Sequence, residues 1–406
     1  MAEATTNASL LLSGRLADVP VSNLRLHPRN PRRGNVAAIR ESLERNGQYT
    51  PLTVNRSTME VLKGNHTLRA ARELGWVEIA VYFVDVSEVV ALRIVLADNR
   101  TSDLATYDLT FLAELLCELD DLAGTGYNTD ALDALLDELA ADRPVEDDEV
   151  PPAPVVPLTR LGELVTLGEH RLVCGDATDP VCYERLLNGE LADVVLTDPP
   201  YGVSYEGKTA SRLQIRNDSE VGLDRLLDVS FKRVDGALGA GAAIYVFHPA
   251  GQLAETFMRA FRLRGWLLRQ GLVWVKDSFV LGRSDYHYQH EPILYGIKPG
   301  EGRRGRGGAG WYGDNKQSSV LSCARPRSSR EHPTMKPPEL VASLLRNSSR
   351  RRQLVLDPFA GSGSTLVACE QLGRRGRLIE LDPAYCDVII NRYQRLTGLT
   401  VTREAA

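Results

Sequence analysis

The fold prediction starts from the stretch Leu354-Val-Leu-Asp-Pro-Phe-Ala-Gly-Ser-Gly-Ser-Thr365. An apolar strand runs into a loop of small residues and then into the start of a helix. Gly361 and Gly363 let the backbone approach a bound ligand, and the helix start offers free amides. Glu380 ends the next apolar strand, where an acid suits the two hydroxyls of a ribose. The pattern indicates a site for an adenosine-containing cofactor, whereas a tight structural turn would explain the loop alone.

Strands and helices alternate on both sides of this stretch. Strand-like runs lie at 161–166, 171–174, 193–197, 242–247, 267–275, 292–297, 353–356 and 377–381. Helical patterns lie at 180–187, 222–238, 250–264, 338–345, 365–372 and 384–396. This alternation predicts an α/β fold with a doubly wound, mainly parallel sheet.

The chain also has an N-terminal part of a different kind. Helical patterns lie at 35–46, 66–74, 86–97, 109–122 and 130–139, and strand-like runs at 51–54 and 78–84. They predict a small α+β unit with a helical tail. Residues 143–157 combine acidic residues with five prolines, which predicts an extended linker. We therefore expect domains at 1–142 and 158–406, joined by this linker.

Charge is unevenly distributed along the chain, although the net charge is only −5. Residues 114–149 hold thirteen acidic residues and one basic residue, whereas residues 301–352 hold twelve Lys or Arg and four acids. The second segment has the charge that phosphate contact needs, and a solvated loop is the alternative. The six cysteines show no metal-ligand spacing, so we expect no metal site and a reduced, cytoplasmic protein. Neither a signal peptide nor a membrane-spanning segment is apparent.

A second motif, Thr197-Asp-Pro-Pro-Tyr-Gly202, follows an apolar strand. Asp198 stands at the strand end, the edge at which open α/β sheets hold ligands. Its carboxylate and the carbonyl of Pro199 can accept the two hydrogens of an exocyclic amine. Pro200 completes the rigid turn, and Tyr201 offers a face on which an extruded base can stack. The set predicts methylation of an amino group, and a proline turn with a packed tyrosine is the alternative.

These motifs resemble those of the amino-group DNA methyltransferases, in the permuted arrangement that places the catalytic tetrad before the cofactor loop. The resemblance covers roughly residues 161–398 and includes Glu331-His-Pro-Thr-Met-Lys-Pro337 and Ile379-Glu-Leu-Asp-Pro-Ala-Tyr385. It implies a Rossmann-like fold and S-adenosyl-L-methionine as cofactor. The implied cofactor-binding residues are Thr334, Lys336, Asp357, Phe359, Gly361, Gly363, Ser364, Thr365 and Glu380. Met335 departs from the family, which usually has glutamine there.

The permutation implies a further strand next to the cofactor site. The run Arg171-Leu-Val-Cys-Gly-Asp176 can supply that strand, which would bring Asp176 near the adenine of the cofactor. By position, the segment rich in glycine and arginine after Pro299 resembles a short target-recognition insert. Its candidate DNA-binding residues are Arg303, Arg304, Arg306, Trp311 and Tyr312. A loop without fixed structure is the alternative for this insert.

The N-terminal part resembles the ParB-like domain. The matching stretches are His27-Pro-Arg-Asn-Pro-Arg32, Gly47-Gln-Tyr-Thr-Pro-Leu-Thr-Val54, Lys63-Gly-Asn-His-Thr-Leu-Arg-Ala70 and Ala97-Asp-Asn-Arg100. Gly64, His66 and Arg69 stand at a loop-to-helix start that could bind a phosphate. The turn is less basic than the family pattern, so we expect DNA docking rather than nucleotide hydrolysis. A scaffold without ligand is the alternative.

The sequence as a whole predicts a double-stranded DNA methyltransferase that acts on N6 of adenine after base flipping. Cytosine-N4 methylation requires the same geometry, and only the family association of Asp198 favours adenine. A ParB-like regulator without catalysis, or a methyltransferase acting on RNA or protein, are the alternatives of other classes. No restriction-nuclease motif is apparent, and the resemblance allows a homodimer.

Overall fold

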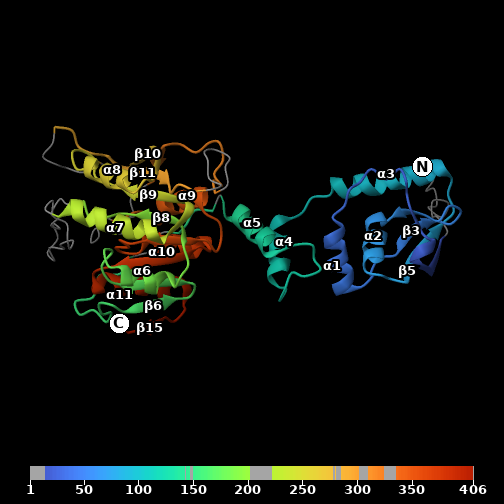
Figure 1. Cartoon of the computed structure of the whole chain (residues 1–406), viewed down its shortest axis with the longest axis horizontal. Coiled ribbons are helices and arrows are strands. Elements are labelled where there is room, and N and C mark those ends of the chain that lie inside the picture. The colour runs from blue at the N-terminus through green and yellow to red at the C-terminus, as the bar shows by residue number, and fades with distance from the viewer. Residues whose placement is uncertain are drawn as a thin grey trace, which may run out of the picture. The chain divides into compact units, whose positions relative to one another are not determined.

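The chain forms two compact units, Met1–Leu139 and Ala140–Ala406 (Figure 1). The computed structural model describes residues 14–141, 143–146, 150–201, 222–277, 279, 285–300, 310–323 and 335–405. Among these residues no helix is long and apolar enough to cross a membrane.

The N-terminal unit is α+β, as predicted, but its sheet has five strands where the sequence predicts two. Its strands are β1 (Arg15–Pro20), β2 (Arg25–Leu26), β3 (Leu52–Asn55), β4 (Glu60–Lys63) and β5 (Glu78–Val84), in the order β1-β5-β3-β4-β2. The 3-10 turn η2 (Val21–Asn23) and the helices α1 (Val36–Asn46), α2 (Asn65–Glu73), α3 (Glu88–Leu104), α4 (Leu109–Cys117) and α5 (Thr129–Ala140) complete it. Val54, Val61 and Val81 from the sheet and Leu68 from α2 form the centre of its core.

The second unit contains a ten-stranded sheet. Its strands are β6 (Leu164–Leu167), β7 (His170–Cys174), β8 (Ala192–Thr197), β9 (Leu238–Phe247), β10 (Leu267–Val275), β11 (His290–Ile297), β12 (Val320–Ser322), β13 (Leu354–Asp357), β14 (Arg375–Glu380) and β15 (Thr402–Glu404). The order is β12-β10-β11-β9-β8-β13-β14-β7-β6-β15. Neighbours from β9 to β7 are parallel, whereas β11 runs antiparallel to both β9 and β10. This confirms the doubly wound α/β fold and the placement of residues 171–174 beside β14.

Six helices in the described part of this unit cover the two faces of the sheet. They are α6 (Pro180–Leu187), α7 (Leu223–Ala237), α8 (Ala254–Leu263), α9 (Pro338–Ser348), α10 (Ser364–Leu372) and α11 (Pro383–Thr397). Side chains alternate along a strand: Val195 of β8 packs with α6, α7 and α8, whereas Val194 and Leu196 pack with α9 and α10. Helix α11 covers β6, β7 and β14 through a further cluster that includes Ile389 and Tyr393. The sheet is therefore buried on both faces, and its strand ends are left for a site.

Local sequence signals explain where several helices begin and end. In α11 the side chain of Asp382 accepts a hydrogen bond from the amide of Ala384, Pro383 occupies the first turn, and Gly398 ends the helix with φ 71°. Asp179 and Pro180 start α6 in the same way. An acidic cap followed by proline satisfies or removes the amides that a helix start leaves unpaired.

The sequence predicts that residues 143–157 form an extended linker, but the described part of this segment packs on the second unit. Val145 is buried in the core beside α9 and α10, and its amide donates to Glu339 at 2.6 Å. Val150 packs against Met335 and Val388. Val145 and Val150 therefore hold the described part of this segment along the second unit, because burying them completes its hydrophobic surface.

Candidate functional site

The carboxyl ends of the parallel strands in the second unit lie side by side, and the motif residues are found there. Asp198 directly follows β8, Asp357 ends β13 and Glu380 ends β14. These three strands are neighbours in the sheet. Since open α/β sheets bind ligands at the carboxyl ends of their strands, the fold brings the predicted catalytic acid and both predicted cofactor acids to one site.

The tetrad that follows β8 is held by contacts of its tyrosine. The hydroxyl of Tyr201 donates to Oδ1 of Asp198 at 2.8 Å. Its ring meets Phe257 of α8 edge-to-face, with 6.1 Å between ring centroids. Pro199 is buried, and Pro200 is half-buried. The turn after β8 therefore fixes the Asp198 carboxylate and the Tyr201 ring together.

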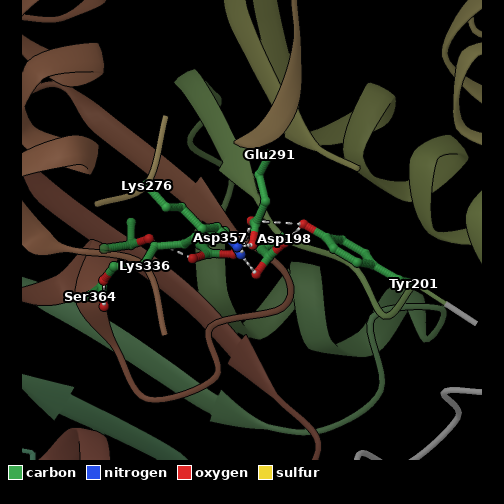
Figure 2. Close-up of polar contacts among 8 residues, drawn as sticks. Asp198, Tyr201, Lys276, Glu291, Lys336, Asp357 and Ser364 are labelled. Atoms are coloured by element: carbon green, nitrogen blue, oxygen red, sulfur yellow. Dashed lines mark hydrogen bonds and ion pairs between the residues drawn. The ribbon is translucent and has the colours of Figure 1, made fainter. Parts of the chain in front are cut away.

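Lys276, Lys336 and Glu291 lie around Asp198 of the tetrad (Figure 2). Together with Asp198 they form a cluster of two lysines and two carboxylates. The ammonium of Lys336 contacts Oδ2 of Asp198 and lies 3.1 Å from Oε2 of Glu291. Lys276, directly after β10, pairs with Oε1 of Glu291. Both lysines are buried. Two charges of each sign are thus paired inside the site, as burial requires.

Burial and pairing act differently on the pKa values of these groups. Burial raises the pKa of Glu291, but the ammonium groups of Lys336 and Lys276 outweigh it and lower that pKa to about 2. Burial alone would lower the pKa of Lys336, yet Asp198 and Glu291 raise it. The pKa of Asp198 is raised by burial and by the charge of Glu291, against the effect of Lys336. Glu291 and Lys336 therefore stay charged, while Asp198 is the carboxyl of this cluster with the higher proton affinity.

Asp357 is buried without an ion-pair partner among the described residues. Its carboxylate accepts hydrogen bonds from the hydroxyl of Thr365 at 2.6 Å and from the amide of Phe359 at 3.1 Å. Burial raises its pKa to about 7, against these hydrogen bonds. Asp357 is therefore an acceptor that is held in place but not neutralised by a cation.

Glu380 lies against the glycine-rich loop. Oε2 accepts from the amide of Gly361 and Oε1 from the amide of Asp382, both at 2.8 Å. Burial raises its pKa to about 7 as well. Gly363 has φ 87°, and a Cβ there would lie 2.9 Å from Ile389 of α11. The loop thus needs glycine for both its backbone conformation and its close contact with α11.

The cofactor loop is also connected to the segment that carries Lys336. The hydroxyl of Ser364, at the start of α10, donates to the carbonyl of Lys336 at 2.6 Å (Figure 2). One hydrogen bond therefore joins the predicted cofactor loop to the residue that contacts Asp198.

The structure places Asp176 at the neighbouring strand end. β7 pairs with β14 so that Cys174 lies opposite Glu380, and the amide of Gly175 donates to the carbonyl of Glu380 at 2.9 Å. Oδ1 of Asp176 accepts from the amide and the hydroxyl of Thr178, both at 2.8 Å. Oδ1 of Asp176 is therefore occupied by hydrogen bonds within the local turn. A contact between Asp176 and the adenine of the cofactor stays a prediction.

The predicted DNA contacts are only partly described. Thr334, Arg303, Arg304 and Arg306 lie outside the described residues. Trp311 packs 6.1 Å from Tyr295, between ring centroids, against the core. The amide of Tyr312 donates to the carbonyl of Asn347 at 2.9 Å, near the end of α9 that is remote from Lys336. A role of either ring in DNA binding stays a prediction, and Trp311 would have to leave a packing contact to act as a wedge.

In the N-terminal unit, the predicted phosphate residues lie together at the start of α2. Gly64 precedes the helix with φ 92°. Nε2 of His66 accepts from the amide of Gly34 at 2.8 Å, and burial, with the charge of Arg69, lowers the pKa of His66. Arg69 is exposed. The neutral imidazole organises the preceding loop, while Arg69 is accessible.

The sequence did not predict that Lys276 and Glu291 lie beside Asp198. The only sequence signals are a lysine directly after one apolar strand and a glutamate at the start of the next. Their contact depends on the antiparallel register in which Val275 lies opposite His290. That register becomes visible only in the structure.

The site fits an adenosine cofactor that carries hydroxyl and ammonium donors. Asp357 and Glu380 are acceptors without a cation among the described residues, and both stand beside a glycine loop at a helix start. Hydroxyl groups and a cation on a ligand would offset the cost of their burial.

Comparisons with known proteins find relatives of both units. Residues 192–392 match the family described as DNA methylase, and residues 5–100 match the ParB N-terminal domain. The protein YubD of Escherichia coli (strain K12), described as a methylase, is 30% identical over 197 residues, 48% of this chain and 79% of YubD. The type II methyltransferase M.HpaI of Haemophilus parainfluenzae is 24% identical over 244 residues, 55% of this chain and 74% of that enzyme. The crystal structure of the M1.HpyAVI-SAM complex overlaps 54% of this chain and 98% of its own, with 19% identity and a TM-score of 0.40.

The matched segment contains the tetrad, the cofactor loop and the two acids that follow β13 and β14. The chain therefore belongs to the DNA methylase family, and it is a site-specific DNA methyltransferase of the amino-methyltransferase class that depends on S-adenosylmethionine and carries a ParB N-terminal domain.

Proposed function

We propose that the chain methylates the N6 amine of adenine in double-stranded DNA after flipping the base out of the helix. The observation that carries this proposal is the half-buried Asp198 carboxylate, which directly follows β8, the strand next to the one that leads into the cofactor loop. A carboxylate is the strongest acceptor that this position of the tetrad could offer to an exocyclic amine.

The residues of the tetrad would act as follows. Asp198 and the carbonyl of Pro199 accept the two hydrogens of the target amine, which directs the lone pair of its nitrogen away from them. S-adenosylmethionine supplies a methyl group bound to a positively charged sulfur. As the N–C bond forms and the C–S bond breaks, the electron pair stays on sulfur and the nitrogen becomes positive. Asp198 then takes the surplus proton, which its raised pKa favours. The ring of Tyr201 stacks on the flipped base.

The test is methyl transfer from labelled S-adenosylmethionine to unmethylated duplex DNA, followed by nucleoside analysis. Label in N6-methyladenine that is lost in Asp198→Ala would support the proposal. Label in N4-methylcytosine would replace it with cytosine-N4 methylation. Glu190→Gln is a suitable control, because Glu190 pairs with Arg375 and Arg377 just before β8 begins, at the opposite edge of the sheet.

We further propose that residues 1–142 form a ParB-like DNA-docking domain, that 143–157 connect it, and that 158–406 form the catalytic domain of a cytoplasmic enzyme. The exposed Arg69 beside the start of α2 supports contact with a DNA phosphate. Arg69→Ala should weaken DNA binding similarly for all sequences and reduce the salt dependence of binding by roughly one phosphate contact. An unchanged salt dependence would leave this domain a scaffold. A homodimer is compatible with these proposals, and sedimentation would test it.

A further inference from the structure

Both oxygens of the catalytic carboxylate are already occupied. Oδ1 of Asp198 accepts from Tyr201 at 2.8 Å, and Oδ2 contacts the ammonium of Lys336. A carboxylate paired with an ammonium has less charge to offer to an incoming amine, and it is a weaker base. Methyl transfer therefore requires that Asp198 be released, at least in part, from these two donors.

Glu291 lies within reach of the same two donors. Its Oε2 is 3.1 Å from Nζ of Lys336 and 3.4 Å from the hydroxyl of Tyr201. Its Oε1 is held by Lys276 from the other side. Figure 2 shows Glu291 and Asp198 on either side of the Lys336 ammonium. The antiparallel strand β11 thus brings a second carboxylate, already anchored, to the donors that occupy the first.

We propose that Glu291 is a positioning residue, which takes over Lys336 and Tyr201 from Asp198 when the target amine enters. This inference rests on the proposed role of Asp198 as the acceptor of that amine. Glu291 itself does not touch the reacting atoms. It acts by freeing the oxygens of Asp198 while it keeps the ammonium paired.

The charges of the cluster permit this exchange. Lys336 contacts both carboxylates in the observed arrangement, so a shift towards Glu291 keeps its ammonium paired, and the hydrogens of the target amine replace it as the donors to Asp198. Lys276 remains on Glu291 throughout and holds it in place. Among the described residues, the carboxyl of Asp357 also interacts electrostatically with Asp198 and with Lys336, while its hydrogen bonds come from Thr365 and Phe359.

The test is Glu291→Gln, which keeps the shape of the side chain and removes its charge. Single-turnover methyl transfer should become roughly ten- to a hundredfold slower, the loss expected for one hydrogen bond to a charged group. The dissociation constant for S-adenosylmethionine should change less than threefold. The acid limb of the pH–rate profile should move to lower pH, because the charge of Glu291 contributes to the raised pKa of Asp198. A residue that only supports the fold would not move that limb.

Two further variants separate this role from a folding defect. Glu291→Asp retains the charge, so it should restore part of the rate and keep the acid limb in its wild-type position. Glu190→Gln removes a carboxylate that also pairs with two cations, but at the opposite edge, and should behave as wild type. Thermal unfolding of each variant reports on folding.

The outcomes separate this inference from the proposed function. If wild type methylates DNA and Glu291→Gln retains the wild-type rate, or slows without moving the acid limb, the inference is wrong. If wild type binds S-adenosylmethionine but yields no methylated nucleoside, the proposed function fails instead.

Discussion

Replacing Asp357 by asparagine should stabilise the catalytic unit while it weakens cofactor binding. The carboxyl is almost fully buried, at 4% exposure, and burial raises its pKa from 3.8 to about 7. Each tenfold change in proton affinity corresponds to about 1.36 kcal/mol, so this difference corresponds to about 4 kcal/mol as an upper limit. Asparagine can keep both local contacts, because its oxygen can accept from Phe359 and its amide can donate to the Thr365 hydroxyl.

The sign of the effect follows from proton linkage. Below about pH 4 the carboxyl is protonated in both the folded and the unfolded chain. As the pH rises to about 7, the unfolded chain loses this proton while the folded chain retains it, so the stability of wild type falls. Above pH 7 the folded chain bears the full cost of a buried charge. Asp357→Asn should therefore exceed wild type in stability at pH 8, and the difference should disappear towards pH 4.

Urea unfolding at several pH values, followed by tryptophan fluorescence, measures this difference. Three of the four tryptophans, Trp266, Trp274 and Trp311, lie in the catalytic unit, so the signal reports mainly on it. Asp179→Asn is the matched control, because it removes the carboxyl of an exposed residue at the cap of α6. If Asp357→Asn is less stable than wild type at pH 8, or if the difference does not depend on pH, the cost assigned to burial of the Asp357 carboxylate is wrong.

Three further predictions concern the cofactor loop and the tetrad. Glu380 and Asp357 both have pKa values raised by burial to about 7, so S-adenosylmethionine should bind wild type up to a hundredfold more weakly for each pH unit below 7. Glu380→Gln should bind more weakly than wild type at pH 8 and lose at most tenfold for each pH unit below 7, as equilibrium dialysis can measure. Tyr201→Phe removes the hydrogen bond to Asp198, which methyl transfer must break in any case, so single turnover should stay within tenfold of wild type. Tyr201→Ala also removes a stacking surface worth about 1–3 kcal/mol and should raise KM for DNA. Gly363→Ala should destabilise the catalytic unit by roughly 1–3 kcal/mol in urea unfolding, because φ is 87° and the new Cβ would lie 2.9 Å from Ile389.

The central elements could be predicted from sequence because each carries its own signal. Continuous apolar runs mark the buried parallel strands, and the caps Asp382 and Asp179 mark the helix starts. The missed strands are short or lie at sheet edges: β2 has two residues, and every residue of β15 is exposed. Such strands form because a neighbouring strand offers unpaired backbone groups. Their sequences therefore lack the regular apolar positions that mark a strand with a buried face.

The predicted and the unpredicted residues of the site differ in what brings them together. Asp198 directly follows β8, and Asp357 and Glu380 end β13 and β14; the carboxyl ends of parallel strands lie side by side. Lys276 and Glu291 meet through an antiparallel register instead. A shift of one residue would turn their side chains to opposite faces, and no feature of the sequence fixes that register beforehand.

Cofactor binding should release protons, because the two acids beside the glycine loop are not paired with cations in the described part of the chain. Near pH 7 Asp357 and Glu380 are each about half protonated, and a ligand that carries hydroxyl donors and positive charge favours their ionised forms. Binding at pH 7 should therefore release about one proton in total. The number should rise towards two near pH 5.5 and fall towards zero near pH 9.

Calorimetric titration with S-adenosylmethionine in buffers of different ionisation enthalpy counts these protons. Glu380→Gln should release about half as many at pH 7, since only Asp357 remains to ionise. Glu291, whose pKa two lysines hold at about 2, is already ionised and should contribute none. A binding enthalpy at pH 7 that is the same in every buffer would show that the two acids are ionised before the cofactor arrives. In that case burial would not govern their protonation, and the pH dependence expected for Asp357→Asn would disappear with it.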